Sequence, residues 1–383
     1  MHTDSISIAL GLPGLAVLDV GDRDPIRVLA RFREEEATCP RCGRRTWQVH
    51  QWHRQVKRDL TACGRQVEIQ LLKRRFRCRR CRKVFTEPDP VCGSRRRSTR
   101  RWRQLLGRRA RWSTVRAVAR EERVSEGLVQ RSWVELHTPP PARHQAPRFL
   151  GIDGFCVSRP HKMWSGFWDL EERAPVAVVP GERQRDVQMV LDGLARPERV
   201  EAVVIDLAEA YRQAVRMALP EAAVVADKFH VIALAGRALR KGRRERRQPG
   251  NAAWLMDRGV ERLRPEEQAR LGRALAGQPE LANGWVLKEE LRALYRCGSP
   301  AAAGQHLDHW LEAARQSRLP SFRRVARTLE KWRDEVLNYW RFPLTNAFVE
   351  GKHNRVKVVK RQAYGYRNDA VFRLRILNLI HTY

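Results

Sequence analysis

The sequence predicts a multidomain protein of the α/β class whose first third is a separate, strongly basic region. Three observations lead to this prediction: two CxxC motifs near the N-terminus, short amphipathic helices after them, and β-branched runs that alternate with helical stretches further on. A chain of 383 residues suggests two or three domains. Its composition, with 43% hydrophobic residues and 12 Trp, is that of a folded protein rather than a disordered basic tail.

The formal net charge of +32 is unevenly distributed along the chain. Residues 51–148 contain 27 Lys and Arg against 8 Asp and Glu, whereas residues 1–50 contain 7 of each kind. Such an excess favours polyanions as partners. No apolar run reaches the roughly 18 residues of a membrane span, and residues 1–11 lack the layout of a secretory signal. We therefore expect a cytoplasmic nucleic-acid-binding protein without a membrane partner, and not a secreted, membrane or collagen-like protein.

Two CxxC motifs, Cys39-Pro-Arg-Cys42 and Cys78-Arg-Arg-Cys81, are separated by 35 residues. Four thiolates in two such turns can close a tetrahedral zinc site, and this spacing in a large chain without a secretory signal favours metal over disulfides. Residues 65–77 alternate between apolar and polar side chains, so we expect a β-hairpin inside the gap. The sequence predicts a structural Zn²⁺ domain over residues 37–92, after an N-terminal segment of residues 1–36.

Other assignments of these residues stay open at this point. Chance CxxC pairs or a redox site are alternatives to zinc, and His50 or His53 could replace one thiolate as a ligand. Cys63 and Cys92 have no partner at a metal-binding spacing, so we expect no part for them in metal binding.

Residues 95–137 are predicted to be helical, with apolar positions at helical spacing that are interrupted near Arg123. Ser125 suits the N-cap of a second helix. Two short helices around a tight turn are typical of a helix-turn-helix. An ordinary helical hairpin has the same pattern, but the basic surroundings favour a DNA-binding domain. Residues 138–147, which include three consecutive prolines, are the expected linker.

Beyond the linker, four apolar runs alternate with turns and helical stretches: Phe149–Ile152, Val176–Val179, Val200–Ile205 and Ala222–Ala226. This alternation indicates an α/β domain over residues 148–234. Residues 235–340 are predicted to be helical, and residues 341–383 to complete the fold. Five tryptophans in or near the helical stretch are expected in the core rather than on a base-stacking surface: Trp254, Trp285, Trp310, Trp332 and Trp340.

Three of the apolar runs end at an aspartate. Asp153 follows the first run, Asp206 ends a later run and opens a helix, and Asp227 ends another. Sheets of this class present such acids at the carboxyl edge of their strands, where ligands bind. Each position alone is weak evidence, because an aspartate that caps a helix is common. The set indicates a site.

The C-terminal segment predicts a helix with one polar face. Asn346, Glu350, Asn354 and Lys357 follow one another at i, i+4, i+8 and i+11, so they share a face. For this helix alone, a solvated face with salt bridges explains the pattern at least as well as a function does. Together with the strand-end aspartates, the face suits a helix that lies against a metal-bound phosphodiester.

Two or three carboxylates that converge on one point cannot all be ionised cheaply unless cations occupy the site. Two Mg²⁺ (or Mn²⁺) ions roughly 3.5–4 Å apart could activate a water or a hydroxyl and stabilise the leaving oxygen of an in-line displacement. A strongly basic chain with DNA-reading domains and such a site would cut or join DNA strands.

The chain resembles the DDE transposases of bacterial insertion sequences, in particular the ISL-three (ISL3) family. Order, spacing and residue type agree over nearly the whole chain. The motifs that carry the resemblance are the four zinc-finger cysteines, Gly151-Ile-Asp153-Gly-Phe155, Ile205-Asp206-x-x-x-x-Tyr211, Asp227-x-Phe229-His230, and the block from Asn346-x-x-x-Glu350-x-x-x-Asn354-x-x-Lys357 to Ala363-Tyr-Gly-Tyr366. The resemblance implies an RNase H-like catalytic core that is interrupted by an α-helical insertion over residues 235–340.

Carried over residue by residue, the resemblance implies that Asp153, Asp206 and Glu350 are the metal-binding catalytic acids. Asp227 and His230 match the D-x-x-H signature of related transposases that carry an insertion, and they would support the site. Asp227 stays open as an alternative to Asp206 for the second acid. The residues expected to approach DNA are Asn354, Lys357, Lys360 and Arg361.

We therefore expect a transposase that binds the terminal inverted repeats of its element and performs metal-dependent strand cleavage and transfer into target DNA. The resemblance also implies action at the bacterial nucleoid as a dimer or larger oligomer, because two transposon ends must be held together. Two alternatives differ in class: a domesticated, non-cutting DNA-binding regulator, and a metal nuclease without transfer activity. The intact acids favour the transposase over the regulator, and the two DNA-binding domains favour it over the nuclease.

Overall fold

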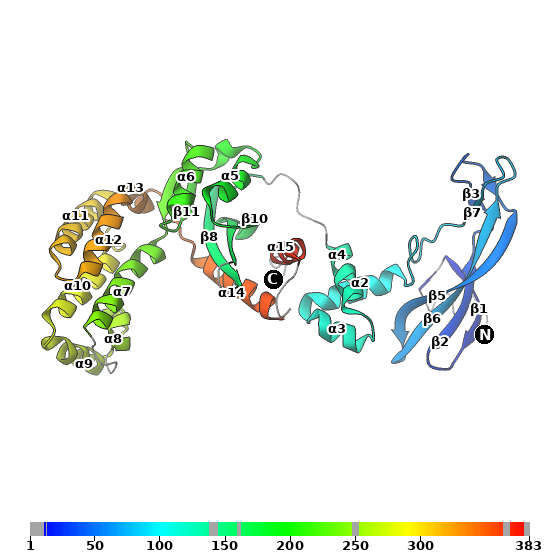
Figure 1. The fold of residues 1–383 in the computed structure, drawn as a ribbon, viewed down its shortest axis with the longest axis horizontal. Coiled ribbons are helices and arrows are strands. Elements are labelled where there is room, and N and C mark those ends of the chain that lie inside the picture. Colours follow the sequence, from blue (N-terminus) through cyan, green and yellow to red (C-terminus); the bar gives the residue numbers. More distant parts are fainter. Residues whose placement is uncertain are drawn as a thin grey trace. The chain divides into compact units, whose positions relative to one another are not determined.

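The computed structural model of the chain describes residues 11–12, 14–137, 145–158, 162–246, 253–362 and 368–378. The chain divides into two units, Met1–Thr138 and Pro139–Tyr383, and each is described by itself (Figure 1). Most of the expected linker and the Ala363–Tyr366 block lie outside the described residues. In the part of the chain that the structure describes, no helix is long and apolar enough to cross a membrane.

A five-stranded sheet forms most of the first unit, with the order β1-β2-β6-β5 and with β7 paired to β6. Strand β2 pairs with β6 in parallel, so the expected N-terminal segment and the expected zinc domain contribute strands to one sheet. One face of this sheet is an apolar core that includes Val28, Ile69 and Leu71. The strands are β1 (Leu15–Gly21), β2 (Ile26–Phe32), β5 (Val49–Ala62), β6 (Arg65–Arg77) and β7 (Val84–Thr86).

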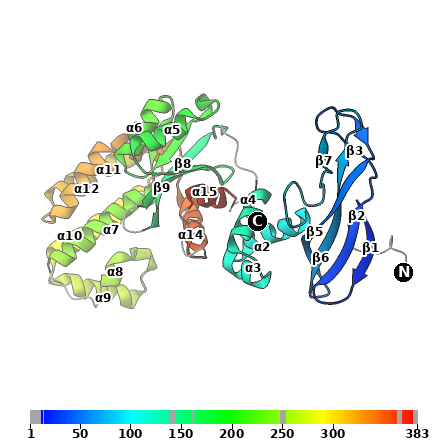
Figure 2. The same ribbon diagram turned by 45° about the vertical axis from the view of Figure 1, so that its right-hand side comes forward.

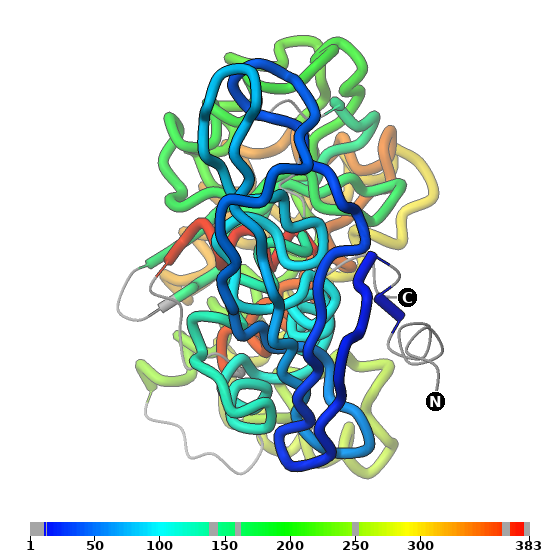
Figure 3. Tube along the Cα trace, turned by 90° about the vertical axis from the view of Figure 1, so that its right-hand side faces the viewer, coloured from blue at the N-terminus to red at the C-terminus, as the bar shows by residue number. Residues whose placement is uncertain are grey.

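The long hairpin of β5 and β6 occurs where the sequence predicted a hairpin, and Figure 3 shows it running along the first unit. Cys63 and Gly64 connect the two strands with φ angles of 51° and 74°. Positive φ at both positions is what a two-residue hairpin loop of type I′ requires. Cys63 is exposed and is a turn residue. A separate two-stranded ladder, β3 (Ala37–Thr38) with β4 (Arg45–Thr46), flanks the first CxxC motif.

Three helices follow the sheet: α2 (Arg100–Trp112), α3 (Val115–Glu121) and α4 (Glu126–Leu136). The prediction that Ser125 caps α4 is confirmed, because its hydroxyl accepts a hydrogen bond from the Leu128 N–H at 3.3 Å.

Helices α2 and α4 pack closely against each other. Trp102 and Leu106 on α2 and Trp133 on α4 are buried. The helices approach each other tightly at Gly107, where an added Cβ would lie 2.8 Å from the carbonyl oxygen of Ser132. A side chain at position 107 would therefore push the two helices apart.

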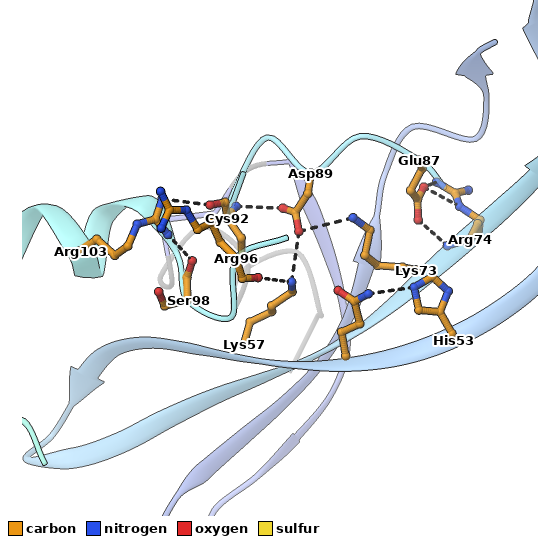
Figure 4. A network of polar contacts seen from close by, with 11 residues as sticks. His53, Lys57, Lys73, Arg74, Glu87, Asp89, Cys92, Arg96, Ser98 and Arg103 are labelled. Carbon is orange, nitrogen blue, oxygen red and sulfur yellow. Dashed lines mark hydrogen bonds and ion pairs between the residues drawn. The ribbon is translucent and has the colours of Figure 1, made fainter. Parts of the chain in front are cut away.

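A buried polar network ties the sheet of the first unit to α2 (Figure 4). The carboxylate of Asp89 lies 3.6 Å from Nζ of Lys57 on β5 and 3.5 Å from Nζ of Lys73 on β6. Asp89 also accepts from the N–H of Cys92 at 2.8 Å, and Arg103 of α2 donates to the Cys92 carbonyl oxygen at 3.0 Å. All five side chains are buried. Cys92 therefore belongs to the connection between the hairpin and α2.

The second unit contains a five-stranded sheet with the order β10-β9-β8-β11-β12. Strands β10, β9 and β8 are antiparallel neighbours, whereas β8, β11 and β12 are parallel. All four predicted apolar runs became strands, and β9 was not predicted. The strands are β8 (Phe149–Ser158), β9 (Lys162–Asp169), β10 (Ala174–Pro180), β11 (Ala202–Ile205) and β12 (Ala223–Ala226).

Helices cover both faces of this sheet (Figure 2). On one face, α5 (Gln184–Asp192), α6 (Glu209–Ala218) and the start of α7 (Lys228–Glu245) share one apolar core with the strands. On the other face, α14 (Ala347–Gln362) and α15 (Asp369–Leu377) pack against alternate residues of β8, β9 and β10. In β8, Leu150 and Ile152 belong to the core of the first face, and Phe155 and Val157 belong to the core of the second, so the strand is buried on both sides.

A group of helices lies between α7 and α14 in the sequence and extends the core of the first face. Four of them begin with proline at the first helical position, which suits its fixed φ. The expectation of core tryptophans is confirmed for Trp310 and Trp332, each 3% exposed, but Trp254 is 41% exposed. These helices are α8 (Ala253–Asp257), α9 (Pro265–Ala276), α10 (Pro279–Leu294), α11 (Pro300–Gln316), α12 (Pro320–Lys331) and α13 (Arg333–Leu337).

Candidate active site and zinc centre

An acid cluster lies where two parallel strands of the second sheet run side by side. Strands β8 and β11 are in register up to Ile152 and Ile205, so the next residues, Asp153 and Asp206, are neighbours. His230 is in the first turn of α7, which begins directly after β12. One ligand atom from each of Asp153, Asp206 and His230 lies within 4.8 Å of the other two. The structure thus brings together three residues that the sequence singled out.

Burial and neighbouring charge make Asp206 hard to ionise. Its burial, with the nearby carboxylates of Asp153 and Glu182, raises the pKa of Asp206 to about 6, although the charge of His230 opposes the rise. Its Oδ1 atom is buried and has no hydrogen-bond partner among the described residues. A divalent cation would compensate both the repulsion and the unpaired oxygen, so this oxygen-rich donor set fits Mg²⁺ or Mn²⁺.

Glu182 is a further carboxylate at this place, and the sequence analysis missed it. It follows β10, and the absence of a side chain at Gly154 on β8 leaves room for it, since an added Cβ would collide with the Glu182 carboxylate. Burial, and then the charge of Asp153, raises the pKa of Glu182. A signal was present, because the run Val176–Val179 is followed by an acid, as are the runs before the other strand-end acids.

Asp227 lies behind the cluster. Its side chain is buried, its Oδ2 is 3.0 Å from Nδ1 of His230, and its Oδ1 accepts from the backbone N–H of Asn346 at 3.3 Å. The hydrogen bond with Asp227 raises the pKa of His230, which favours the imidazolium. In this structure Asp206 is the acid beside Asp153, and Asp227 holds His230.

Asn346 and His353 connect the last helices to the acid-bearing strands. Nδ2 of Asn346 donates to the carbonyl oxygens of Ile152 at 3.2 Å and Val204 at 3.4 Å, so this one side chain spans β8 and β11. Nδ1 of His353 lies 3.2 Å from Oδ2 of Asp153. Both side chains are buried. His353 occupies one of the unspecified positions of the C-terminal motif, so the spacing of the motif did not show that it faces the first acid.

A second cluster, of four sulfur atoms, lies in the first unit. The Sγ atoms of Cys39, Cys42, Cys78 and Cys81 lie within 4.8 Å of one another. The pairs Cys39–Cys81 and Cys42–Cys78 are 3.6 and 3.5 Å apart. Zn–S bonds of about 2.3 Å place the sulfurs of a tetrahedral site about 3.8 Å apart, so the cluster fits a zinc ion.

Tight turns position the four sulfurs. The Gly43 N–H donates to the Cys39 carbonyl at 3.0 Å, and the Arg82 N–H donates to the Cys78 carbonyl at 2.9 Å. Gly43 and Arg82 have left-handed φ angles of 69° and 59°. Of the two histidines considered as ligands, His50 is exposed and His53 contacts Gln55 at 2.9 Å. Neither belongs to the sulfur cluster.

Comparisons with known proteins decide the family. A model of the ISL3 family, described as a transposase, matches residues 150–376, and a model described as the zinc-finger of transposase IS204/IS1001/IS1096/IS1165 matches residues 35–81. The chain belongs to the ISL3 family of transposases. It is 30% identical over 379 aligned residues to the transposase for insertion sequence element IS1001 of Bordetella parapertussis, with 92% of each chain covered.

A second relative is more distant. This ISL3 transposase is 24% identical over 267 aligned residues to the transposase for insertion sequence element IS1557 of Mycobacterium tuberculosis. The alignment covers 61% of this chain and 60% of that protein. The predicted family and the predicted zinc finger are confirmed by these matches.

Glu350 is not part of the acid cluster of this transposase. Its side chain is exposed in the first turn of α14, while Val349, His353 and Val356 form the buried face of that helix. The expected polar face therefore divides, because Asn346 is buried against the strands and its other three members are exposed. At 3.6 residues per turn, Glu350 lies about 60° around the helix from His353, at the border of the inward face.

The candidate DNA-binding residues lie further along α14. Asn354, Lys357 and Arg361 are exposed, and Lys360 is partly exposed. Nζ of Lys357 donates to Oδ1 of Asn354 at 3.2 Å. This end of the helix is accessible to a polyanion.

Proposed function

We propose that this transposase binds the terminal inverted repeats of its insertion sequence and uses divalent metal ions to cut the DNA and join it to a target. The observation that carries the proposal is the convergence of Asp153, within β8, and Asp206, directly after the parallel strand β11, where burial and neighbouring carboxylates raise the pKa of Asp206. In a member of a transposase family, that place is suited to a metal-bound phosphodiester.

The strand order of the second sheet supports an RNase H-like core. Three antiparallel strands are followed by two parallel ones, with the acids on β8 and directly after β11. Helices α8–α13 are inserted between the strands and α14, as expected for a core interrupted before its last acid. We assign residues 148–234 and 341–383 to the core and residues 235–340 to the insertion.

Asp153 and Asp206 are the proposed ligands of the metal ions, with Glu350 as the third acid and Glu182 as a further candidate. Bound ions would supply Lewis acidity and neutralise charge at the phosphate. The other residues would act on the protein side of the site. His353 would orient the Asp153 carboxylate, Asn346 would keep β8 and β11 at a fixed separation, and Asp227 would hold His230 toward the cluster.

In the proposed reaction, the oxygen of a water molecule bonds to phosphorus while the bond to the 3′-oxygen of the element end breaks. This step leaves a 3′-hydroxyl on the element and a 5′-phosphate on the flanking DNA. The 3′-hydroxyl then bonds to a phosphorus of the target DNA and displaces a second 3′-oxygen. Both steps are in-line displacements, so one site can serve both.

The first unit is the proposed reader of the inverted repeats. Its zinc finger and the α3–α4 pair, proposed as a helix-turn-helix, lie in the most basic part of the sequence. Residues Lys357, Lys360, Arg361 and Asn354 would contact phosphates near the cut. We also propose a dimer or larger oligomer on paired ends, acting at the nucleoid.

The third acid can be tested by comparing single substitutions on DNA that carries the element's own end. Glu350→Gln is expected to abolish cleavage and to leave repeat binding nearly intact. Glu198→Gln, an exposed carboxylate near the opposite end of β11, is the matched control and should cut normally. Normal cleavage by Glu350→Gln together with its loss in Glu182→Gln would transfer the role to Glu182. Specific binding by the unsubstituted protein without cleavage in any divalent metal would instead favour the non-cutting regulator.

A further inference from the structure

Helix α7 begins at the acid cluster and carries a line of basic side chains away from it. His230, Arg237 and Arg244 are at i, i+7 and i+14 within Lys228–Glu245. A seven-residue step turns only about 20° around a straight helix and advances about 10.5 Å along it. The three residues therefore lie on one side of α7, opposite its buried face.

The two arginines on this line, Arg237 and Arg244, make no polar contact with the part of the chain that the structure describes. Both are exposed, and among the described residues neither has an ion-pair or hydrogen-bond partner. A solvated face with salt bridges accounts for two other basic residues of the same helix, since Arg240 lies 3.1 Å from Asp257 and Lys241 lies 4.0 Å from Glu245. It does not account for Arg237 and Arg244.

A large apolar side chain is exposed where this line starts. Phe229, next to His230, is 48% exposed, and Nζ of Lys228 lies 5.4 Å from its ring centroid. An exposed ring beside cations is typical of surfaces that bind single strands, because unpaired bases stack on the ring while the cations contact the backbone, so Phe229 suits a base that is unpaired at the cut. The side of α7 that includes Phe229, Arg237 and Arg244 is called the α7 track below.

We propose that the α7 track is a second DNA-binding surface of this transposase, along which the strand that has a phosphate at the acid cluster continues. The proposal rests on the proposed function, because it takes the cluster as the place of the scissile phosphate. A DNA strand advances about 3.4 Å per nucleotide along a B-form duplex. Arg237 and Arg244 would thus meet phosphates about three and six nucleotides from the cut.

The proposal gives the helical insertion a function. Helix α7 leads from the acid cluster into helices α8–α12, which share its apolar core (Figures 1 and 2). Beyond the sheet, α7 packs against α10 and α12. The insertion then supports a surface that fixes the DNA next to the cut, separate from the reader of the inverted repeats.

The test compares the salt dependence of DNA binding in the full chain, with Asp206→Asn present throughout to prevent cutting. The probe is a labelled duplex that carries the element's own end and about ten base pairs of flanking DNA. The slope of log K against log salt is negative, and each lost phosphate contact reduces its magnitude by about 0.9. Arg237→Gln with Arg244→Gln should therefore reduce the magnitude of the slope by about 1.8. Hydroxyl-radical footprints should lose protection about three to six nucleotides to one side of the cut.

Two controls make the result specific. Arg196 and Arg199 are exposed and lie before β11, whereas Asp206 follows that strand. Arg196→Gln with Arg199→Gln should keep the parent slope and footprint. Replacing Arg237 and Arg244 by lysine retains both charges and should keep most of the slope.

An unchanged slope and footprint in the Arg237→Gln, Arg244→Gln variant would overturn the proposal. So would an equal loss in the Arg196→Gln, Arg199→Gln control, because any two surface charges would then have the same effect. Failure of the proposed function is seen separately. The unsubstituted protein would then bind the probe without any Mg²⁺-dependent cut, whatever the slopes show.

Discussion

Replacement of Asp206 by asparagine is expected to stabilise the metal-free protein while it removes metal binding. In the folded protein the pKa of Asp206 is about 6, against a reference value of 3.8. A difference of about two pKa units corresponds to about 3 kcal/mol between the two protonation states. Keeping Asp206 ionised without a bound cation therefore destabilises the folded state by that amount. Asp206→Asn avoids this cost, because asparagine carries no charge.

The sign of the pH dependence follows from the raised pKa. The contribution of Asp206 to stability is fully present below pH 3.8, falls as the pH rises, and is lost above about pH 6. The advantage of Asp206→Asn should therefore reach about 3 kcal/mol at pH 7.5 and shrink to about one third of that at pH 4.5. For a unit of this size, about 3 kcal/mol raises the melting temperature by about 6–12 °C.

Scanning calorimetry of the full chain in EDTA at both pH values is the assay, with Asp192→Asn as the matched control. Asp192 is an exposed acid at the end of α5, so its substitution should not change the melting temperature. Addition of Mg²⁺ should then raise the melting temperature of the unsubstituted protein but not that of Asp206→Asn. Two results would refute the interpretation of Asp206 as a buried acid that binds a cation. One is no rise in melting temperature in Asp206→Asn, and the other is an equal rise at pH 4.5 and pH 7.5.

Three further experiments test other parts of the fold. Cys39→Ser should lower bound zinc and weaken repeat binding, as measured by elemental analysis and anisotropy, and unchanged zinc would contradict the four-thiolate site. Gly107→Ala should lower the free energy of unfolding by about 1–3 kcal/mol, because the added methyl group pushes against α4. The control is Gly272→Ala in α9, whose Cβ meets nothing within 4 Å and which should raise the free energy of unfolding by about 0.5–1 kcal/mol. Equal effects of the two substitutions in thermal melts would contradict the packing. Asp89→Ala leaves two buried lysines without their counter-charge and should cost about 3–5 kcal/mol in urea unfolding, so a cost below about 1 kcal/mol would show that the lysines are solvated.

Local patterns explain why part of this structure could be predicted from sequence. A CxxC motif specifies its own turn, so Cys39 to Cys81 predicted the zinc finger that the family model confirms. An apolar run that stops at an acid is typical of a strand end, so Asp153 and Asp206 were expected together. Asp206 does follow the end of β11, whereas β8 continues to Ser158, so Asp153 lies within its strand. Glu182 follows the same rule, but Pro180 and Gly181 stand between the run and the acid and obscured it.

Long-range pairing and helix rotation could not be predicted. The parallel pairing of β2 with β6 joins distant segments, and neither segment specifies its partner. Strand β9 lacks a two-residue alternation because Trp164 to Trp168 are buried on both faces. The contact of His353 with Asp153, and the exposure of Glu350, depend on how α14 is rotated about its axis. That rotation is set by packing against β8 and not by the spacing of the motif.

The central claim is that the cluster of Asp153 and Asp206 cuts DNA at the end of the element. The most direct test is to incubate the purified protein with labelled DNA carrying its own element's end, in Mg²⁺ or EDTA, and to map any nick to the nucleotide. The account predicts a Mg²⁺-dependent nick at the repeat boundary that is lost in Asp206→Asn and kept, at a reduced rate, in Asp227→Asn. A nick that persists in Asp206→Asn, or tight specific binding with no nick in any divalent metal, would contradict it.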